Sequence, residues 1–272
     1  MTDLLVATDL LDLAIGIARE AGKLQRERFH QPRVVETKTS AIDLVTDVDR
    51  ASEALIVERI VAARPDDSII SEEEGGRAGS SGVCWIIDPL DGTTNYTHAF
   101  PHFAVSIGIE RGGVRQVGVI YDPIRDELFS GARGRGARLN GEPIHVSETR
   151  ELRQALLGTG FAYDVHTNDI DNLDYFARFI KRAQAVRRAG SAALDLAYVA
   201  CGRFDGFWEI QLHAWDVAAG MLLVEEAGGR LSDLDGGAAP SSGERIVASN
   251  GPLHGALLDV LRDGRNRGTS EE

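Results

Sequence analysis

Acidic side chains gather in three separated segments of this 272-residue chain. The segments read IISEEEG at 69–75, WIIDPLDGTTN at 85–95 and HAWDVAAG at 213–220. If they met, two carboxylates about 5 Å apart would repel by roughly 3 kcal/mol at an effective dielectric constant near 20. Such a cluster requires cations, and a ligand set made of oxygen atoms favours hard ions. The three segments therefore predict a site for magnesium or manganese rather than zinc.

The second segment carries the most information. Its strand ends at Asp88, and Pro89 then fixes the backbone angle φ and removes a hydrogen-bond donor. That turn can bring Asp91 to the same side as Asp88. If a helix begins at Gly92-Thr93-Thr94, its backbone amides and hydroxyls form a cradle for a phosphate group. The segment thus joins paired carboxylates to a candidate phosphate site.

Each segment alone also has a simpler interpretation. An Asp-Pro-x-Asp-Gly sequence such as 88–92 is usually a turn. Asp216 could be the N-cap of a helix, and residues 72–74 could form a solvated loop. The functional hypothesis depends on all three segments occurring in one chain.

The elements that must position these acids can be predicted from apolar spacing. Apolar residues at helical intervals predict helices over 3–29, 47–63, 172–181, 192–201, 216–227 and 253–262. Short runs rich in β-branched residues predict strands around 69–70, 83–87, 103–109, 114–120, 127–130, 155–157, 184–187 and 204–209. Asn140-Gly141 predicts a tight hairpin turn, and 232–243 reads as a loop between strands. This alternation predicts an α/β protein with helices packed on mixed sheets.

Composition excludes several classes of protein. The chain has 42 acidic and 29 basic residues, a net charge of −13, which argues against a general nucleic-acid binder. No apolar run approaches the ~20 residues of a membrane span, and the first residues lack the pattern of a signal peptide. Cys84 and Cys201 lie in apolar stretches, as expected of buried, reduced thiols. We therefore expect a cytoplasmic protein that does not contact a membrane.

Three strings together resemble the inositol monophosphatase family: SEEE, WIIDPLDGTTNY and WDVAAGMLLVEEAGG. The resemblance extends from the first helix to about residue 262. It implies an α/β (α+β layered) fold, namely the five-layer αβαβα sandwich of the inositol monophosphatase and fructose-1,6-bisphosphatase type. One domain is expected over 1–262, followed by a frayed tail over 263–272. The resemblance also implies a homodimer that depends on magnesium and is inhibited by lithium.

The resemblance further implies a set of metal ligands. Glu72, Asp88 and the backbone carbonyl of Leu90 correspond to the ligands of a first ion. Asp88, Asp91 and Asp216 correspond to those of a second, with Asp88 bridging the two. Glu72 is also expected to face a third, loosely held ion. Two to three Mg²⁺ ions are thus expected, with Mn²⁺ as a possible substitute.

The expected reaction is hydrolysis of a phosphate monoester by in-line attack of water. Glu72 and the Thr93 hydroxyl are expected to orient that water, with Glu73 as the alternative if the register of the Glu run differs. Asp49 matches a family position that contacts metal-bound water, although it could equally be an acid in the first turn of a helix. Lys38 could either screen the acids or face solvent.

The resemblance also implies a substrate. Glu209 matches a position that accepts hydrogen bonds from inositol hydroxyls, and its alternative is an exposed acid at a strand end. Other substrate-side positions are Asp91, Gly92, Thr93, Arg187, Gly190, Ser191 and Ala192. Arg187 could instead pair with an acid at a dimer interface. The expected substrate is inositol 1-phosphate, with histidinol phosphate or fructose 1,6-bisphosphate as alternatives.

A regulatory role is the competing hypothesis. Some bacterial relatives bind the transcription machinery as well as hydrolysing phosphate esters. Arg133, Arg135 and Arg138 form a small basic patch that could contact RNA polymerase, although a solvated face is the simpler interpretation. The histidines near the motifs, His98 and His102 with His213, have no partner at metal-ligand spacing and are expected to be structural.

Overall fold

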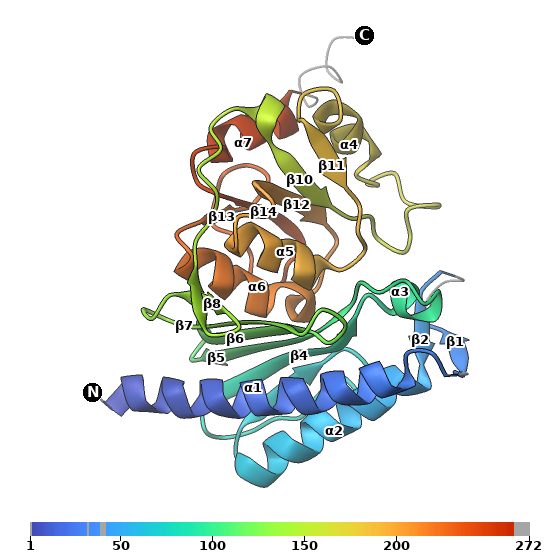
Figure 1. Ribbon diagram of the computed structural model, residues 1–272, viewed down its shortest axis with the longest axis vertical. Helices are drawn as coiled ribbons and strands as arrows, with labels where there is room; N and C mark the ends of the chain where they lie inside the picture. The colour runs from blue at the N-terminus through green and yellow to red at the C-terminus, as the bar shows by residue number, and fades with distance from the viewer. Residues whose placement is uncertain (1, 32, 39–41, 264–272) are drawn as a thin grey trace.

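The computed structural model describes residues 2–31, 33–38 and 42–263. Its helices and sheets alternate in five stacked layers (Figure 1). The outer helices α1 (Thr2–Arg28) and α2 (Asp47–Ala63) lie below a seven-stranded sheet. Helices α5 (Ala192–Ala200) and α6 (Ala214–Glu226) separate this sheet from a five-stranded one. Helices α4 (Leu173–Phe179) and α7 (His254–Arg262) cover the far side, which confirms the predicted αβαβα fold.

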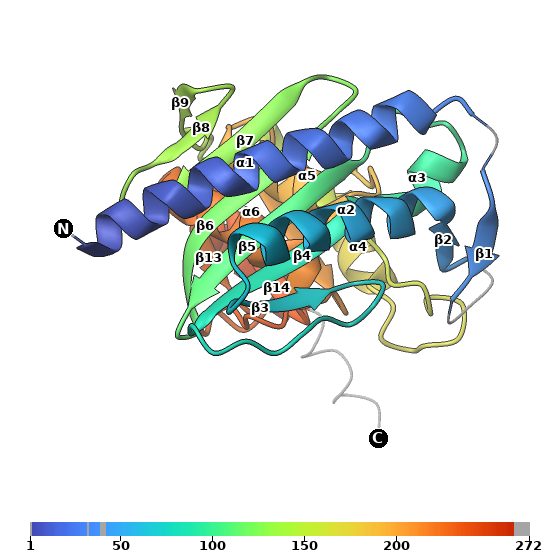
Figure 2. The ribbon, with the colours of Figure 1, turned by 90° about the horizontal axis from the view of Figure 1, so that it is seen from below.

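The first sheet runs almost in chain order. Its strands are β3 (Ser68–Ser71), β4 (Val83–Asp91), β5 (Ala104–Arg111), β6 (Val114–Asp122), β7 (Glu127–Ala132), β8 (Ala137–Leu139) and β9 (Glu142–Ile144). The β3–β4 pair is parallel, whereas each later pair is antiparallel. The predicted turn at Asn140 and Gly141 joins β8 to β9, and both residues have positive φ. Figure 2 shows α1 and α2 lying side by side across this sheet.

The second sheet mixes parallel and antiparallel pairs. Its order is β11 (Ala185–Arg187), β10 (Leu156–Thr159), β12 (Gly206–Ile210), β14 (Arg245–Ser249) and β13 (Arg230–Ser232). β10 pairs in parallel with both β11 and β12, and the remaining pairs are antiparallel. Because β10 and β12 run the same way, their carboxyl ends meet at one edge of the sheet.

Two glycines let α6 lie directly against the first sheet. Gly108 and Gly118 face each other on β5 and β6. A Cβ atom on Gly108 would lie 2.6 Å from the Cβ of Ala218, and one on Gly118 would lie 2.5 Å from the carbonyl oxygen of Ala219. Neither position has room for a side chain, so the backbone of α6 approaches that of the sheet. This contact fixes Asp216, which lies in the first turn of the same helix.

The structure adds elements that the sequence did not predict. Strands β1 (Val35–Thr37) and β2 (Leu44–Thr46) form a small separate sheet, and α3 (Thr93–Thr97) is a single short helix. A 3-10 turn, η1, spans Leu152–Gln154. The expected tail over 263–272 lies outside the described residues except for Asp263. In the described ranges, no helix combines the length and apolar character needed to cross a membrane.

Candidate active site

The three acidic segments meet in one cavity of about 640 Å³, whose walls come from both sheets and from α5 and α6. Eleven of the residues predicted for the site line it: Glu72, Asp88, Leu90, Asp91, Gly92, Thr93, Gly190, Ser191, Ala192, Glu209 and Asp216. The structure therefore brings together segments that lie up to 144 positions apart (72 to 216) in the chain.

A bulge in β4 places two of the acids on one side of the sheet. Asp88 pairs with Ser106 and Asp91 pairs with Ala104, so three steps along β4 oppose two steps along β5. In a regular strand, two residues three positions apart point to opposite faces of the sheet. The extra residue of the bulge turns the side chains of Asp88 and Asp91 to the same face. The backbone N–H of Leu90 donates to Asp88 Oδ1 at 3.0 Å, which closes the turn.

Backbone and hydroxyl donors hold the other two aspartates. Ser191 Oγ and the N–H of Ala193 donate to Asp91 Oδ2 at 2.5 and 2.8 Å. The N–H of His213 donates to Asp216 Oδ2 at 2.7 Å. His213 is the N-cap of α6, so Asp216 is the third helical residue rather than the N-cap itself. Both side chains are therefore fixed by the first turns of α5 and α6.

The cavity concentrates negative charge. Burial raises the pKa of Asp88 well above its usual range, and Glu72, Asp91 and Asp216 add to the shift. Burial likewise raises the pKa of Asp216 well above its usual range and that of Asp91 to about 6. Each carboxylate thus makes its neighbours harder to ionise, which is the condition under which cations bind favourably.

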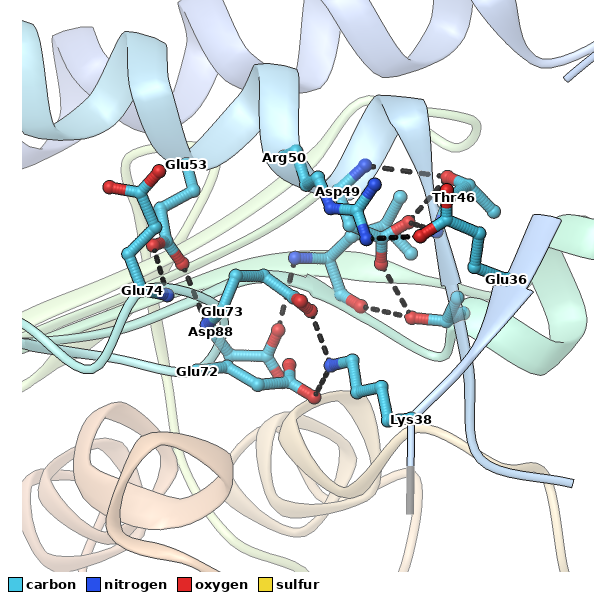
Figure 3. A network of polar contacts seen from close by, with 12 residues as sticks. Glu36, Lys38, Thr46, Asp49, Arg50, Glu53, Glu72, Glu73, Glu74 and Asp88 are labelled. Atoms are coloured by element: carbon cyan, nitrogen blue, oxygen red, sulfur yellow. Dashed lines mark hydrogen bonds and ion pairs between the residues drawn. The ribbon is translucent and has the colours of Figure 1, made fainter. Parts of the chain in front are cut away.

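Lys38 supplies one positive charge to this cluster. Its Nζ donates to Glu72 Oε1 at 2.8 Å and also to the carboxylate of Glu73 (Figure 3). Burial opposes the charge on Lys38, but Glu72 and Glu73 outweigh it and raise the pKa of Lys38. Lys38 therefore screens the acids rather than facing solvent. Across the described ranges, no three acidic, histidine or cysteine side chains are arranged, as they stand, to hold a metal ion.

Asp49 lies behind the cavity wall rather than in it. It is fully buried, and its Oδ1 accepts a hydrogen bond from Thr93 Oγ1 at 2.7 Å. Its Oδ2 accepts from the backbone N–H of Thr46 at 2.9 Å, as the second half of a capping box at the start of α2. The side chain is thus an acid in the first turn of a helix, which it caps, and it also orients Thr93. Its contact with metal-bound water stays a prediction. Because Thr93 gives its proton to Asp49, the hydroxyl oxygen keeps its lone pairs for another donor.

The second sheet supplies the opposite wall. Glu209, on β12, is 7% exposed and points toward Gly160, where a Cβ atom would lie 2.1 Å from its Oε1. Burial raises the pKa of Glu209 to about 8, with Arg188 opposing the shift. The Nδ2 atom of Asn95 donates to the carbonyls of Ala189 and Gly190 at 2.9 and 3.2 Å. These bonds tie the predicted substrate loop to α3.

A family model described as the inositol monophosphatase family matches residues 7–265. The chain belongs to the inositol monophosphatase family. It is 48% identical over 254 residues to the inositol-1-monophosphatase of Synechocystis sp., covering 92% of this chain and 88% of that protein. It is 44% identical over 256 residues to the Nus factor SuhB of Escherichia coli strain K12, covering 93% and 96%.

Among solved structures, the inositol monophosphatase from Anabaena (Nostoc) sp. PCC 7120 superposes with a TM-score of 0.85 at 45% identity. The match covers 94% of this chain and 96% of that one. Membership of the inositol monophosphatase family supports phosphatase activity for this chain. It also agrees with the resemblance carried by the three acidic strings.

The structure places Arg188 rather than Arg187 in the cavity of this family member. Arg187 ends β11 and is exposed, and successive residues of an extended chain point to opposite sides. Asp195 on α5 also lines the cavity and was missed, because it reads as one more residue of an apolar helix. Gly158 and Gly160, which leave room beside Asp195 and Glu209, were the available signal.

Proposed function

We propose that this protein is a metal-dependent phosphomonoesterase that hydrolyses inositol 1-phosphate to inositol and phosphate. The observation that carries the proposal is the convergence of Glu72, Asp88, Asp91 and Asp216 on one cavity. Phosphate monoesters hydrolyse very slowly in water, so the site must supply more than ~15 kcal/mol of transition-state stabilisation. A cavity rich in carboxylates can do so through the cations that it attracts.

The donor set fits two to three Mg²⁺ ions, with Mn²⁺ as a substitute. Glu72, Asp88 and the Leu90 carbonyl would hold one, and Asp88, Asp91 and Asp216 another. Lys38 Nζ donates to Glu72 Oε1, so Lys38 would share this carboxylate with the ion. When bound, such ions supply charge neutralisation at the phosphoryl oxygens and an acidified water.

The chain's own residues orient the attacking water. Thr93 accepts a hydrogen bond from it, since the Thr93 proton is directed to Asp49. Thr93, held by Asp49, sets the line of attack on phosphorus. Glu72 takes the second proton of the water as the water oxygen bonds to phosphorus. The bond from phosphorus to the inositol oxygen breaks, and a water molecule protonates that leaving oxygen. The amides of Gly92 and Thr93 hold the phosphate where α3 begins.

The second wall binds the alcohol. Glu209 accepts hydrogen bonds from inositol hydroxyls, and the segment Gly190–Ala192 borders the ring as α5 begins. Arg188, rather than the predicted Arg187, is placed to contact a charged or polar group of the substrate. This polar wall favours a polyhydroxylated leaving group over an apolar one.

A phosphate-release panel tests the proposal. Inositol 1-phosphate, histidinol phosphate, fructose 1,6-bisphosphate and glycerol 2-phosphate are assayed with Mg²⁺, with and without Li⁺. We expect the highest kcat/KM for inositol 1-phosphate and inhibition by Li⁺. D91N retaining full activity with Mg²⁺ would contradict the metal site, and a preference for histidinol phosphate would reassign the substrate.

A role in transcription is a second candidate, supported by the 44% identity to a protein named Nus factor SuhB. The basic patch gives it little support. Arg133 Nε donates to the carbonyl of Arg115, and an Arg138 guanidinium N–H donates to the carbonyl of Gly141. A pull-down with RNA polymerase tests it, and D88N separates binding from catalysis because it removes an acid of the cavity alone.

We further propose that the protein is a homodimer. The outer face of α4 supports this, because Leu173, Ala177 and Ile180 are exposed at helical spacing, with exposed Ile170 just before them. Analytical ultracentrifugation should show a dimer that L173R shifts to monomer. A monomeric wild-type chain at micromolar concentration would rule this out.

A further inference from the structure

Glu53 on α2 is a buried acid with an unusual set of partners. It is 1% exposed, and both oxygens of its carboxylate accept backbone hydrogen bonds. The N–H of Glu73 donates to Oε2 at 2.9 Å, and the N–H of Glu74 donates to Oε1 at 2.7 Å (Figure 3). Within the described ranges, no lysine, arginine or histidine forms an ion pair with Glu53. Two backbone amides therefore hold this carboxylate.

A buried carboxylate is energetically unfavourable at the location of Glu53. Asp49 lies one turn before Glu53 on α2, and the backbone of Glu73 and Glu74 lies next to the Glu53 carboxylate (Figure 3). Burying another negative charge among acids is unfavourable unless its hydrogen bonds compensate. A glutamine of the same shape offers one acceptor oxygen and would direct its NH₂ group at the second backbone N–H. The carboxylate is thus the side chain that can accept from both amides at once.

These two amides directly follow Glu72. Before Glu72, β3 pairs with β4 up to Ser71, which lies opposite Ile87 next to Asp88. After Glu72, Glu53 holds the backbone at Glu73 and Glu74. The main chain of Glu72 is fixed on both sides, and its side chain lines the cavity while it accepts a hydrogen bond from Lys38.

The same helix also supports the other loop of the site. Asp49 accepts from Thr93, just after β4, and Glu53 accepts from the loop after β3. One rigid helix thus contacts both the loop that carries Glu72 and the segment after β4 that carries Thr93.

We propose that Glu53 is a positioning residue: it fixes the backbone after Glu72 so that the Glu72 carboxylate faces Asp88, and thereby sets the affinity of the cavity for divalent cations. This inference rests on the proposed metal-dependent function. It concerns the binding of the ion, so it is measured on the metal-free protein and not through turnover alone.

The experiment compares E53Q with wild type, and E58Q is the matched control. Glu58 lies on the same helix but its side chain is 73% exposed. Mn²⁺ binding is measured by isothermal titration calorimetry. We expect about tenfold weaker binding for E53Q, since loss of a residue that supports a metal ligand typically costs 10–100-fold in affinity. E58Q should bind Mn²⁺ like wild type.

A double-mutant cycle with E72Q identifies the route of the effect. If Glu53 acts through Glu72, E53Q should change Mn²⁺ affinity by less than about twofold in the E72Q background. E53D, which keeps the charge on a shorter side chain, serves if E53Q does not fold, and its affinity should lie between those of wild type and E72Q.

Unchanged Mn²⁺ affinity in a folded Glu53 variant would overturn the positioning role and leave the proposed function intact. An undiminished effect in the E72Q background would overturn it too. Failure of the wild type to bind Mn²⁺ at all would instead remove the metal-dependent function, and the role of Glu53 with it.

Discussion

The two walls of the cavity are built differently. On the wall formed by β4 with the first turn of α6, hydrogen bonds to Asp88, Asp91 and Asp216 fix each carboxylate. On the wall formed by the second sheet and α5, no hydrogen bond from another described residue reaches the side chain of Glu209, and Asp195 Oδ1 is buried without a partner. In the proposed function, the protein itself therefore fixes the carboxylates on the phosphate side, whereas the alcohol side has unused acceptors.

We infer from this difference that one wall carries out the reaction and the other selects the leaving group. Fixed carboxylates suit a reaction that is the same for every phosphate ester, because positions of charge must not change between substrates. Unsatisfied buried acceptors carry an energetic penalty that a substrate hydroxyl removes. The alcohol wall can therefore discriminate between leaving groups without altering the phosphate wall.

Removing one carboxylate from the phosphate wall should give the largest effect. D88N should lower kcat/KM for all phosphate esters by on the order of 10³-fold, the scale of losing a main electrostatic contact. The same variant should unfold at a higher temperature than the metal-free wild type, because burial and the neighbouring Glu72, Asp91 and Asp216 disfavour a charge on Asp88 in the folded protein. Enzyme assays and calorimetry measure both. Activity of D88N within tenfold of wild type would contradict the assignment of the reaction to this wall.

Changing the alcohol wall should give a smaller and selective effect. E209Q and D195N should each raise KM for inositol 1-phosphate about tenfold, since an ordinary hydrogen bond contributes about 0.5–1.5 kcal/mol. Hydrolysis of p-nitrophenyl phosphate, which lacks hydroxyl groups, should change less than about threefold. Steady-state kinetics on both substrates provide the test. Equal losses on the two esters would show that this wall serves the chemistry as well.

A third effect concerns stability and lies outside both walls. His254 is fully buried between Ser249 and Ser232, and burial lowers its pKa to about 4. In the unfolded chain the pKa is about 6.5, so the unfolded state binds more protons between pH 6.5 and pH 4. Stability should therefore be full above pH 6.5 and fall by up to about 3 kcal/mol as the pH decreases to 4.

Urea unfolding at pH 7 and pH 4.5 measures this loss. H254Q should flatten the pH dependence without removing it, because burial also lowers the pKa of His102 to about 4. An unchanged slope in H254Q would show that His254 does not cause the acid sensitivity.

Much of this arrangement can be read from local sequence. The predicted helix over 47–63 matches α2 residue for residue, because a Thr46 cap begins it and Pro65 follows its end. The acids of the phosphate wall lie in continuous strings, so their convergence could be predicted too.

The residues that were missed depend on contacts between distant segments. The partners of Glu53 are backbone amides 20 and 21 positions away, which no side-chain pattern reveals. Arg187 and Arg188 differ by one step of an extended chain, and the sequence does not show which of the two faces the cavity. The β1–β2 pair was missed because its strands are three residues long and one is fully exposed.

The glycine pair beneath α6 affects how precisely this helix is placed against the first sheet. Because Gly108 and Gly118 leave no side chain between helix and sheet, the gap between these layers is a contact of main chain with main chain. Rotamers cannot adjust such a gap. The contact between the backbones of α6 and the sheet thus sets the location of Asp216. A single methyl group at either glycine would shift the carboxylate of Asp216, several residues away.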